Sequence, residues 1–287
     1  MSMLMQFLKK LRNFWLGAFE TQYPAYFDLL KKSNNSKDIE NQRRLENPLY
    51  LDRFGYKVYS QNDEDGMIQE IFNRIGTTNK FFIEFGVMHG LESNGHYLLF
   101  NGWRGLWIDG NVEYFQELKK YFSNPLATQQ LTAINAFITV ENINELIGGA
   151  GKIKGEIDLL SIDVDGNDYW IWEAIHCIQP RVVVIEYNAK FPPPCEWVMK
   201  YSPDYIWDHS DNHGASLKSL ELLGEKLGYQ LVGTNTSGVN AFFVKKELTR
   251  NLFPTPATAE NLYHTFQPNL YKCSGHPVKK YIGAPFI

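Results

Sequence analysis

The sequence predicts an α/β fold built on a doubly wound, mostly parallel, seven-stranded sheet with an antiparallel last strand. Short apolar runs alternate with segments of helical periodicity between residues 81 and 227, which is typical of βα units. Gly86 and Gly90 follow the first apolar run, at a spacing suited to a tight turn between a strand and a helix. Two further β runs flank Ser237 and Gly238, which indicates a closing hairpin.

Each element follows from its local pattern. Apolar runs of strand length predict strands at 81–84, 105–109, 131–138, 156–164, 181–187, 229–234 and 241–245. Apolar residues at helical spacing predict helices at 67–75, 112–122, 141–147, 169–175 and 215–227, and the polar cluster 60–66 precedes the first of them. Because the hairpin comes last in the chain, we expect it to add an antiparallel edge to the sheet.

The 287 residues divide into three predicted parts: an amphipathic helical extension (1–45), the α/β domain (46–246) and an irregular tail packed on that domain (247–287). In the extension, apolar residues recur at helical spacing, but charged residues interrupt every apolar run well short of the ~18 residues that a membrane span needs. We therefore expect neither a signal peptide nor a transmembrane segment. Packing on the domain or on a second subunit in a homo-oligomer is the favoured role, and membrane-surface binding is the alternative.

Composition narrows the class of partner. The net charge of −4 and the pI near 6.0 give no electrostatic support for binding nucleic acid. The three cysteines, Cys177, Cys195 and Cys273, are odd in number and form no C-x-x-C pair. A reduced, cytoplasmic compartment is the expectation that follows.

The loop after the first predicted strand has features of a nucleotide-cofactor site. Glycine tolerates unusual backbone angles and lets main-chain N–H groups approach a ligand at the mouth of a parallel sheet. The second strand ends in Asp109, where α/β nucleotide binders place a carboxylate that accepts hydrogen bonds from ribose hydroxyls. The segment from Gly86 to Gly90 lacks the G-x-G-x-x-G spacing of dinucleotide enzymes, which argues against a dehydrogenase.

Polar residues follow the later predicted strands, and three interpretations of them stay open. Carboxylates from neighbouring strands with an amide are the oxygen ligands that Mg²⁺ or Mn²⁺ prefers, which makes Asp163, Glu186 and Asn188 candidate metal ligands. Without a metal, Asp163 or His213 would be the general base. A turn that caps the next helix would explain residues 165–168 with no chemistry at all.

Seven short motifs occur in order between residues 56 and 246. They are S-Q-N-D-E-D-G (60–66), F-I-E-F-G-V-x-x-G (82–90), G-L-W-I-D-G-N (105–111), D-L-L-S-I-D-V-D-G-N-D (158–168), V-V-I-E-Y-N (183–188), G-A-S-L (214–217) and N-A-F-F-V (240–244). In number, order and spacing they resemble the S-adenosylmethionine (SAM)-dependent methyltransferase superfamily, and within it the FkbM-type methyltransferases. This chain has Asp165 where that family often has Glu.

The resemblance implies a Rossmann-like sheet that binds SAM at the C-terminal ends of its first strands. Carried over by position, nine residues would contact the cofactor: Glu84, Gly86 and Gly90 near the methionine part, Asp109 at the ribose, Ala136 and Phe137 at the adenine, and Gln61, Ser93 and Asn94 near the carboxylate. The implied activity is O-methylation of a small-molecule or sugar hydroxyl, with or without a divalent metal. A non-catalytic domain that kept the fold for interaction is the remaining alternative.

Overall fold

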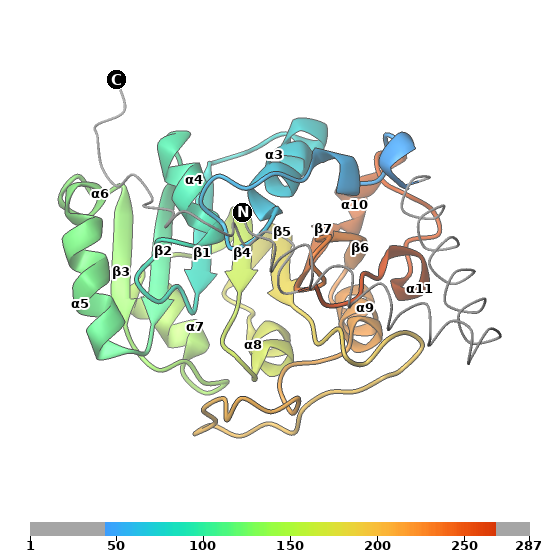
Figure 1. The fold of residues 1–287 in the computed structure, drawn as a ribbon. Coiled ribbons are helices and arrows are strands. Elements are labelled where there is room, and N and C mark those ends of the chain that lie inside the picture. Colours follow the sequence, from blue (N-terminus) through green and yellow to red (C-terminus); the bar gives the residue numbers. More distant parts are fainter. Residues whose placement is uncertain (1–43, 268–287) are drawn as a thin grey trace, which may run out of the picture. The chain divides into compact units, whose positions relative to one another are not determined.

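The computed structural model describes residues 44–267, and a seven-stranded sheet of order β3-β2-β1-β4-β5-β7-β6 forms its centre (Figure 1). β1 to β5 are parallel, and β7 is antiparallel to both of its neighbours. This is the predicted doubly wound, mostly parallel, seven-stranded sheet with an antiparallel last strand, so the predicted fold class is confirmed. The strands are β1 (Phe81–Phe85), β2 (Arg104–Asp109), β3 (Leu131–Asn135), β4 (Gly155–Ile162), β5 (Ile178–Glu186), β6 (Tyr229–Thr234) and β7 (Asn240–Lys245).

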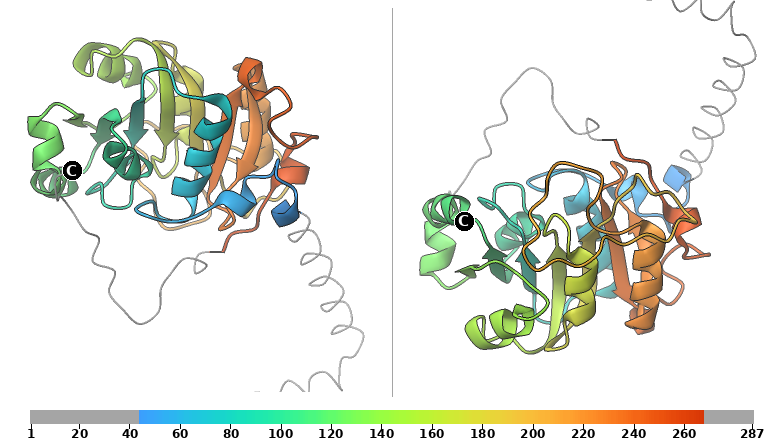
Figure 2. Two further views of the ribbon diagram at one scale, coloured as in Figure 1. Left: turned by 90° about the horizontal axis from the view of Figure 1, so that it is seen from above. Right: turned by 90° about the horizontal axis from the view of Figure 1, so that it is seen from below.

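Helices cover both faces of the sheet (Figure 2). Successive strand residues point to opposite faces, so Phe82 and Trp107 pack with α3, α4 and α5, whereas Ile83 and Leu106 belong to the core that contains α8 and α9. Burial on both faces is the reason that the strands read as continuous apolar runs. The helices are η1 (Asp52–Phe54), α3 (Glu64–Ile75), α4 (Asn94–Phe100), α5 (Val112–Tyr121), α6 (Ser123–Ala127), α7 (Ile143–Glu145), η2 (Leu146–Ala150), α8 (Asp168–Ala174), α9 (Leu217–Lys226), α10 (Lys246–Thr249) and α11 (Ala259–Leu262).

The structure differs from the sequence predictions in several details. α4, α10 and α11 were not predicted. β3 ends at Asn135 instead of residue 138, and α6 was not predicted, because Pro125 indicates a break although proline is tolerated in the first turn of a helix. The hairpin does extend one edge of the sheet, with β7 antiparallel to both β5 and β6. Its outermost strand is β6, because the connection through α9 carries β6 past the position that β7 then fills.

The two predicted end segments are described only in part. Except for its last two residues, the extension 1–45 lies outside the described residues. The described part of the tail, 247–267, contains α11 and buries Phe253, Ala259 and Leu262 in the two cores. No helix within 44–267 is both long and apolar enough to cross a membrane.

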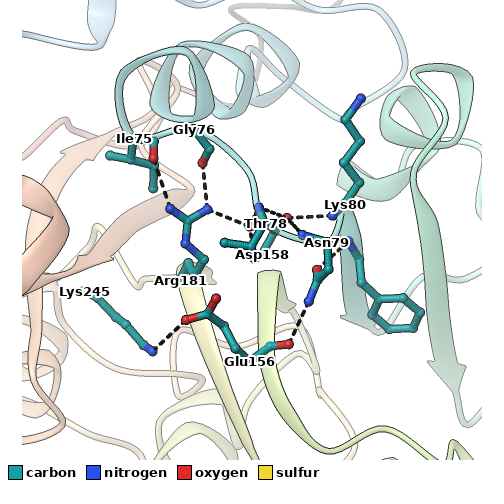
Figure 3. Close-up of polar contacts among 10 residues, drawn as sticks. Ile75, Gly76, Thr78, Asn79, Lys80, Glu156, Asp158, Arg181 and Lys245 are labelled. Atoms are coloured by element: carbon teal, nitrogen blue, oxygen red, sulfur yellow. Dashed lines mark hydrogen bonds and ion pairs between the residues drawn. The ribbon is translucent and has the colours of Figure 1, made fainter.

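Asp158 and Arg181 form a buried ion pair between β4 and β5, toward the ends where these strands begin (Figure 3). Nη1 of Arg181 lies 2.7 Å from Oδ1 of Asp158, and the guanidinium also donates to the carbonyls of Ile75 and Gly76. The carboxylate accepts the N–H groups of residues 78–80. Burial opposes ionisation, but these donors outweigh it and lower the pKa of Asp158. The network fixes the end of α3 and the start of β1 to the sheet.

Candidate functional site

A pocket of about 350 Å³ opens at the C-terminal ends of β1 to β4. This is the switch point of the sheet, where the chain leaves β3 at one edge and returns to place β4 beside β1. Open α/β sheets bind ligands at such points. The lining residues are Gly86, Met88, Ile108, Asp109, Gly110, Asn111, Tyr114, Phe137, Ile138, Val164, Asp165, Asn167, Tyr205, Ile206 and Trp207.

Gly86 sets the floor of the pocket between β1 and β4. Its φ of +66° is left-handed, and a Cβ atom there would lie 1.6 Å from the carbonyl oxygen of Asp163. Only glycine fits such a close approach of two backbones. The predicted glycine loop therefore brings the β1 loop directly onto the end of β4.

Asp109, the last residue of β2, presents its carboxylate at the pocket wall. Its oxygens accept the N–H groups of Met88 and Asn111, each at 2.7 Å. Each carboxylate oxygen can accept a further hydrogen bond, so the group remains able to bind a ligand hydroxyl. Burial raises the pKa of Asp109 despite these two donors. Met88 is held at φ +51°, and non-glycine residues in such strained conformations cluster at functional sites.

Apolar side chains form the rest of the wall near Asp109. Ile138 is buried, whereas Phe137 is 48% exposed where β3 gives way to its loop. Val164, just past β4, completes this surface. A flat, apolar group bound beside the Asp109 carboxylate would be covered on this side.

Glu84 lies in the middle of β1 but does not line the pocket. Its carboxylate accepts the N–H groups of Asn94 and Gly95 at the start of α4, and the indole N–H of Trp107 at 3.0 Å. Burial nevertheless raises the pKa of Glu84 to about 7. The structure therefore gives Glu84 a role in fixing α4 to the sheet.

The other predicted cofactor residues also lie outside the pocket lining. Ser93 donates from its hydroxyl to the Gly90 carbonyl, and the amide of Asn94 donates to the Ser161 hydroxyl. Gly90, at φ +79°, packs closely on the ring of Trp107. These residues shape the loop that carries Met88. The two remaining residues are Gln61, which is exposed, and Ala136, which is half-buried.

Asp163 and Glu186 lie side by side at the ends of β4 and β5. Ile162 pairs with Ile185 in the parallel register, so Asp163 and Glu186, the residues that follow them, are neighbours. Burial raises the pKa of both carboxyl groups well above their ordinary values, and the charges of neighbouring acids raise them further. Such a pair holds a proton more tightly than isolated carboxylates do.

His213 approaches this pair from the loop before α9. Its Nδ1 lies 3.9 Å from Oε2 of Glu186. Burial and the charge of Lys190 lower the pKa of His213, which favours the neutral imidazole. A neutral imidazole can accept a proton, so the structure leaves His213 available as a base.

Residues 164–168 form the turn after β4, which contains a buried carboxyl group and also lines the pocket. Asp168 is fully buried and accepts the N–H groups of Val164 and Gly166, while burial raises its pKa to about 6. This turn holds Asp165 at φ +58° on the pocket wall. The predicted structural turn is therefore present, and it also positions a carboxylate at the pocket.

The predicted metal ligands Asp163, Glu186 and Asn188 lie at and just beyond the ends of β4 and β5. Within the described part of the chain, no three His, Cys, Asp or Glu side chains are grouped so that they could hold a metal ion. The amide of Asn188 donates to the carbonyls of Asp211 and His213, and its oxygen accepts the N–H of Lys190. Asn188 thus orders the loop that carries His213, and its polar atoms are already engaged.

The sequence analysis missed several pocket residues. Asn111 caps α5 through its side chain, and Tyr114 is the residue whose N–H it binds, so a polar residue at the start of a helix was the available signal. Tyr205, Ile206 and Trp207 come from the long loop after β5, which runs along the C-terminal ends of the strands (Figure 1). That loop has no periodicity, so the sequence carried no signal that would place it here.

Comparisons with known proteins add the following findings. No protein-family model and no curated protein matches the sequence. Among solved structures, a Staphylococcus aureus protein assigned as a caffeoyl-CoA O-methyltransferase is 13% identical over 82% of this chain and 99% of its own, with a TM-score of 0.44. The N-terminal domain of EvdMO1, solved with SAH and D-fucose, is 13% identical over 73% of this chain and 96% of its own, with a TM-score of 0.42. A Bacillus cereus O-methyltransferase in complex with SAH is 12% identical over 64% of this chain and 80% of its own, with a TM-score of 0.40.

Proposed function

We propose that this chain is a SAM-dependent O-methyltransferase that acts on a hydroxyl group of a small molecule or sugar. The observation that carries the proposal is the Asp109 carboxylate, held by the N–H groups of Met88 and Asn111 at the wall of the switch-point pocket. The methyltransferase-like order of the seven motifs in the sequence supports the same cofactor.

The pocket has the chemistry that SAM requires. Asp109 would accept hydrogen bonds from the ribose, the apolar wall at Phe137 and Ile138 would cover the adenine, and the methionine part would extend along Gly86. The volume of about 350 Å³ lies within the range of about 300–1,000 Å³ that is usual for small-molecule sites. Because β1 lies between β2 and β4, a ligand anchored at Asp109 and running past Gly86 points toward Asp163.

Bound SAM would supply a methyl group on a positively charged sulfur. The acceptor oxygen would form the new bond to the methyl carbon, the carbon–sulfur bond would break with its electrons left on sulfur, and the hydroxyl proton would pass to a base. The pocket residues would hold the two reactants in line, which is the main contribution of an enzyme to such a displacement. The acids at the ends of β4 and β5 would receive the proton.

We assign the general base to Asp163, with His213 as the second candidate. Burial raises the pKa of the Asp163 carboxyl group, and a carboxylate with a raised pKa accepts a proton more readily than an ordinary one. Glu186 stands beside both groups and would stabilise the proton once it is transferred. The turn fixed by Asp168 keeps Asp163 at the end of β4.

The proposal assigns no step to a metal, since within residues 44–267 no three His, Cys, Asp or Glu side chains are grouped as metal ligands. The predicted Mg²⁺ or Mn²⁺ site at Asp163, Glu186 and Asn188 therefore stays an untested prediction. Treatment with EDTA tests it directly. We expect turnover to survive chelation, and loss of turnover that Mg²⁺ or Mn²⁺ restores would show that the assignment of a metal-free base is wrong.

Transfer of a labelled methyl group from SAM to a panel of glycosides, nucleotide sugars and small hydroxylated compounds tests the proposed function. Asp163→Asn should lower the rate by about 10²- to 10⁴-fold while leaving SAM affinity nearly unchanged, because the base acts on the acceptor. Glu113→Gln, at an exposed acid in the first turn of α5, removes one charge near the pocket and is the matched control. Binding of SAM with no transfer to any compound would favour the non-catalytic alternative.

The finer assignments belong to the same proposal. These are the FkbM-type grouping, a sugar as acceptor, and assembly into a homo-oligomer through residues 1–45. Light scattering of the whole chain and of a variant lacking residues 1–40 tests assembly. We expect the deletion to change the oligomeric state or solubility and to leave SAM binding intact.

A further inference from the structure

Exposed apolar side chains gather at the mouth of the switch-point pocket. Met88, Tyr114, Phe137, Ile206 and Trp207 all line it, and each is at least 38% exposed. They come from separate parts of the chain: the β1 loop, α5, the end of β3 and the long loop after β5. Apolar groups left uncovered around one pocket mark a surface that a ligand covers.

Ile206 is the extreme case, since 78% of its surface is exposed. It belongs to residues 203–210, which we call the flap. The flap is anchored at both ends. At one end, the Asn167 amide donates to the Ser202 carbonyl at 2.8 Å, and at the other, the Asn188 amide donates to the Asp211 carbonyl at 2.8 Å. The anchors fix where the flap begins and ends beside the pocket.

The tip of the flap is bonded mainly to itself. The indole N–H of Trp207 donates to the Ser210 carbonyl, and the N–H of Ser210 donates to the Asp208 carboxylate. Tyr205, whose ring packs on Gly166, closes the base through a hydrogen bond from its hydroxyl to the Asn212 carbonyl. A segment anchored at its ends and joined to itself at its tip can shift as a unit at little cost.

Trp207 also lies between the pocket and His213, near the acids to which we assign proton transfer. It lines the pocket, and its ring lies edge-on to that of His213, with the centroids 5.7 Å apart. His213 in turn lies beside Glu186. A ligand that contacts the Trp207 indole would therefore influence the position of His213, the second candidate for the general base.

We propose that Ile206 and Trp207 are cofactor-binding residues and that the flap closes them over the adenine and ribose of SAM. The proposal rests on the proposed function for the identity of the ligand. Closure would cover the most exposed apolar side chain at the pocket and place the indole on the adenine, opposite Phe137. The bound cofactor would then form part of the surface that orients His213 toward the acceptor.

Calorimetric titration with SAM and with SAH tests the proposal without a known acceptor. Trp207→Ala should weaken both ligands by about tenfold or more, because base–aromatic stacking contributes ~1–3 kcal/mol. Trp207→Phe should restore most of that affinity, whereas a merely structural role would give no such rescue. Ile206→Ser should weaken binding to a smaller extent. Leu222→Ala, at an exposed apolar residue of α9, is the control and should change nothing.

Fluorescence gives the second readout. The difference between the wild-type and Trp207→Phe spectra isolates Trp207, and its quenching by acrylamide should fall when SAM is added. If SAM binds the wild type, Trp207→Ala and Ile206→Ser with equal affinity, and Trp207 stays equally open to acrylamide, the flap inference is wrong while the proposed function stands. If the wild type binds neither SAM nor SAH, both are wrong.

Discussion

β4 and β5 position two pairs of charged residues with opposite character, a buried pair near their starts and a partly buried pair at their ends. Near the start of β4 and β5 the pair is Asp158 and Arg181, and five residues further along each strand it is Asp163 and Glu186. The first pair joins opposite charges, and the Asp158 carboxylate also accepts several backbone N–H groups. The second joins like charges, with the half-buried His213 close to it.

The pKa values follow this difference. The donors around Asp158 lower its pKa although it is buried, whereas burial and mutual repulsion raise the pKa of Asp163 and Glu186. One end of the sheet is therefore built for stability. The other retains an electrostatic cost, which is typical of catalytic sites, where carboxyl groups need shifted pKa values. The end that carries this electrostatic cost is the one to which we assign the proposed chemistry.

The largest expected effect comes from breaking the balanced pair. Arg181→Met should lower the free energy of unfolding by about 3–5 kcal/mol, because it leaves the Asp158 carboxylate buried without its cation. Urea denaturation followed by circular dichroism measures this. Arg181→Lys keeps the charge but loses the planar guanidinium that donates to the carbonyls of Ile75 and Gly76. Its free energy of unfolding should therefore lie between those of the wild type and of Arg181→Met. A loss below about 1 kcal/mol for Arg181→Met would show that the pair contributes little.

The second effect is on the pH dependence of stability. A carboxyl group with a raised pKa binds its proton more tightly in the folded chain, so its contribution is present below the unfolded pKa and is lost as pH rises through the folded value. Glu84 has an ordinary pKa of 4.5 and a folded pKa of about 7, which corresponds to roughly 3 kcal/mol lost between about pH 4.5 and 7. Asp168, with a folded pKa of about 6, acts in the same direction.

Asp158 has the opposite sign, since its lowered pKa gives stability that is lost only as pH falls through the folded value. We therefore expect the unfolding free energy to decline from about pH 4.5 to pH 7, and Glu84→Gln to flatten that decline. Denaturant titrations at several pH values measure both. Stability that rises across this range would contradict the raised pKa values.

A smaller effect of opposite sign should follow from neutralising the like-charged pair. Glu186→Gln should raise the unfolding free energy at pH 8 by about 0.5–2 kcal/mol, as substitutions that relieve active-site strain commonly do, and should lower methyl transfer. Glu247→Gln, at an acid of α10 for comparison, should leave both unchanged. A destabilised Glu186→Gln protein would mean that the two acids already share a stabilising proton that the amide cannot replace.

The sequence predicted the sheet because both of its faces are buried, which makes each strand a distinct apolar run. It predicted Gly86 and Asp109 because each follows the end of such a run. Glu84, which was predicted beside the cofactor, shares a face of β1 with Phe82 and so points toward α4. The partnership of Asp158 with Arg181 joins residues from different strands and no local pattern encodes it.

The flap illustrates the same limit. Residues 203–210 have neither the alternation of a strand nor the spacing of a helix, and they reach the pocket because anchors at Asn167 and Asn188 hold their ends. Their place depends on contacts between distant segments, which become visible only once the chain is folded. Asn188, which the sequence analysis offered as a metal ligand, is one of these anchors.

The most direct test of the account is SAM affinity with Asp109 altered. Isothermal titration should show that the wild type binds SAM, and that Asp109→Asn weakens binding at least about tenfold by removing charge-assisted hydrogen bonds worth ~1.5–3 kcal/mol. Thermal unfolding of the variant checks that the loop at Met88 survives. The exposed Glu113→Gln variant should bind like the wild type. Equal SAM affinity for Asp109→Asn and the wild type, or no SAM binding by either, would contradict the assignment of this pocket to the cofactor.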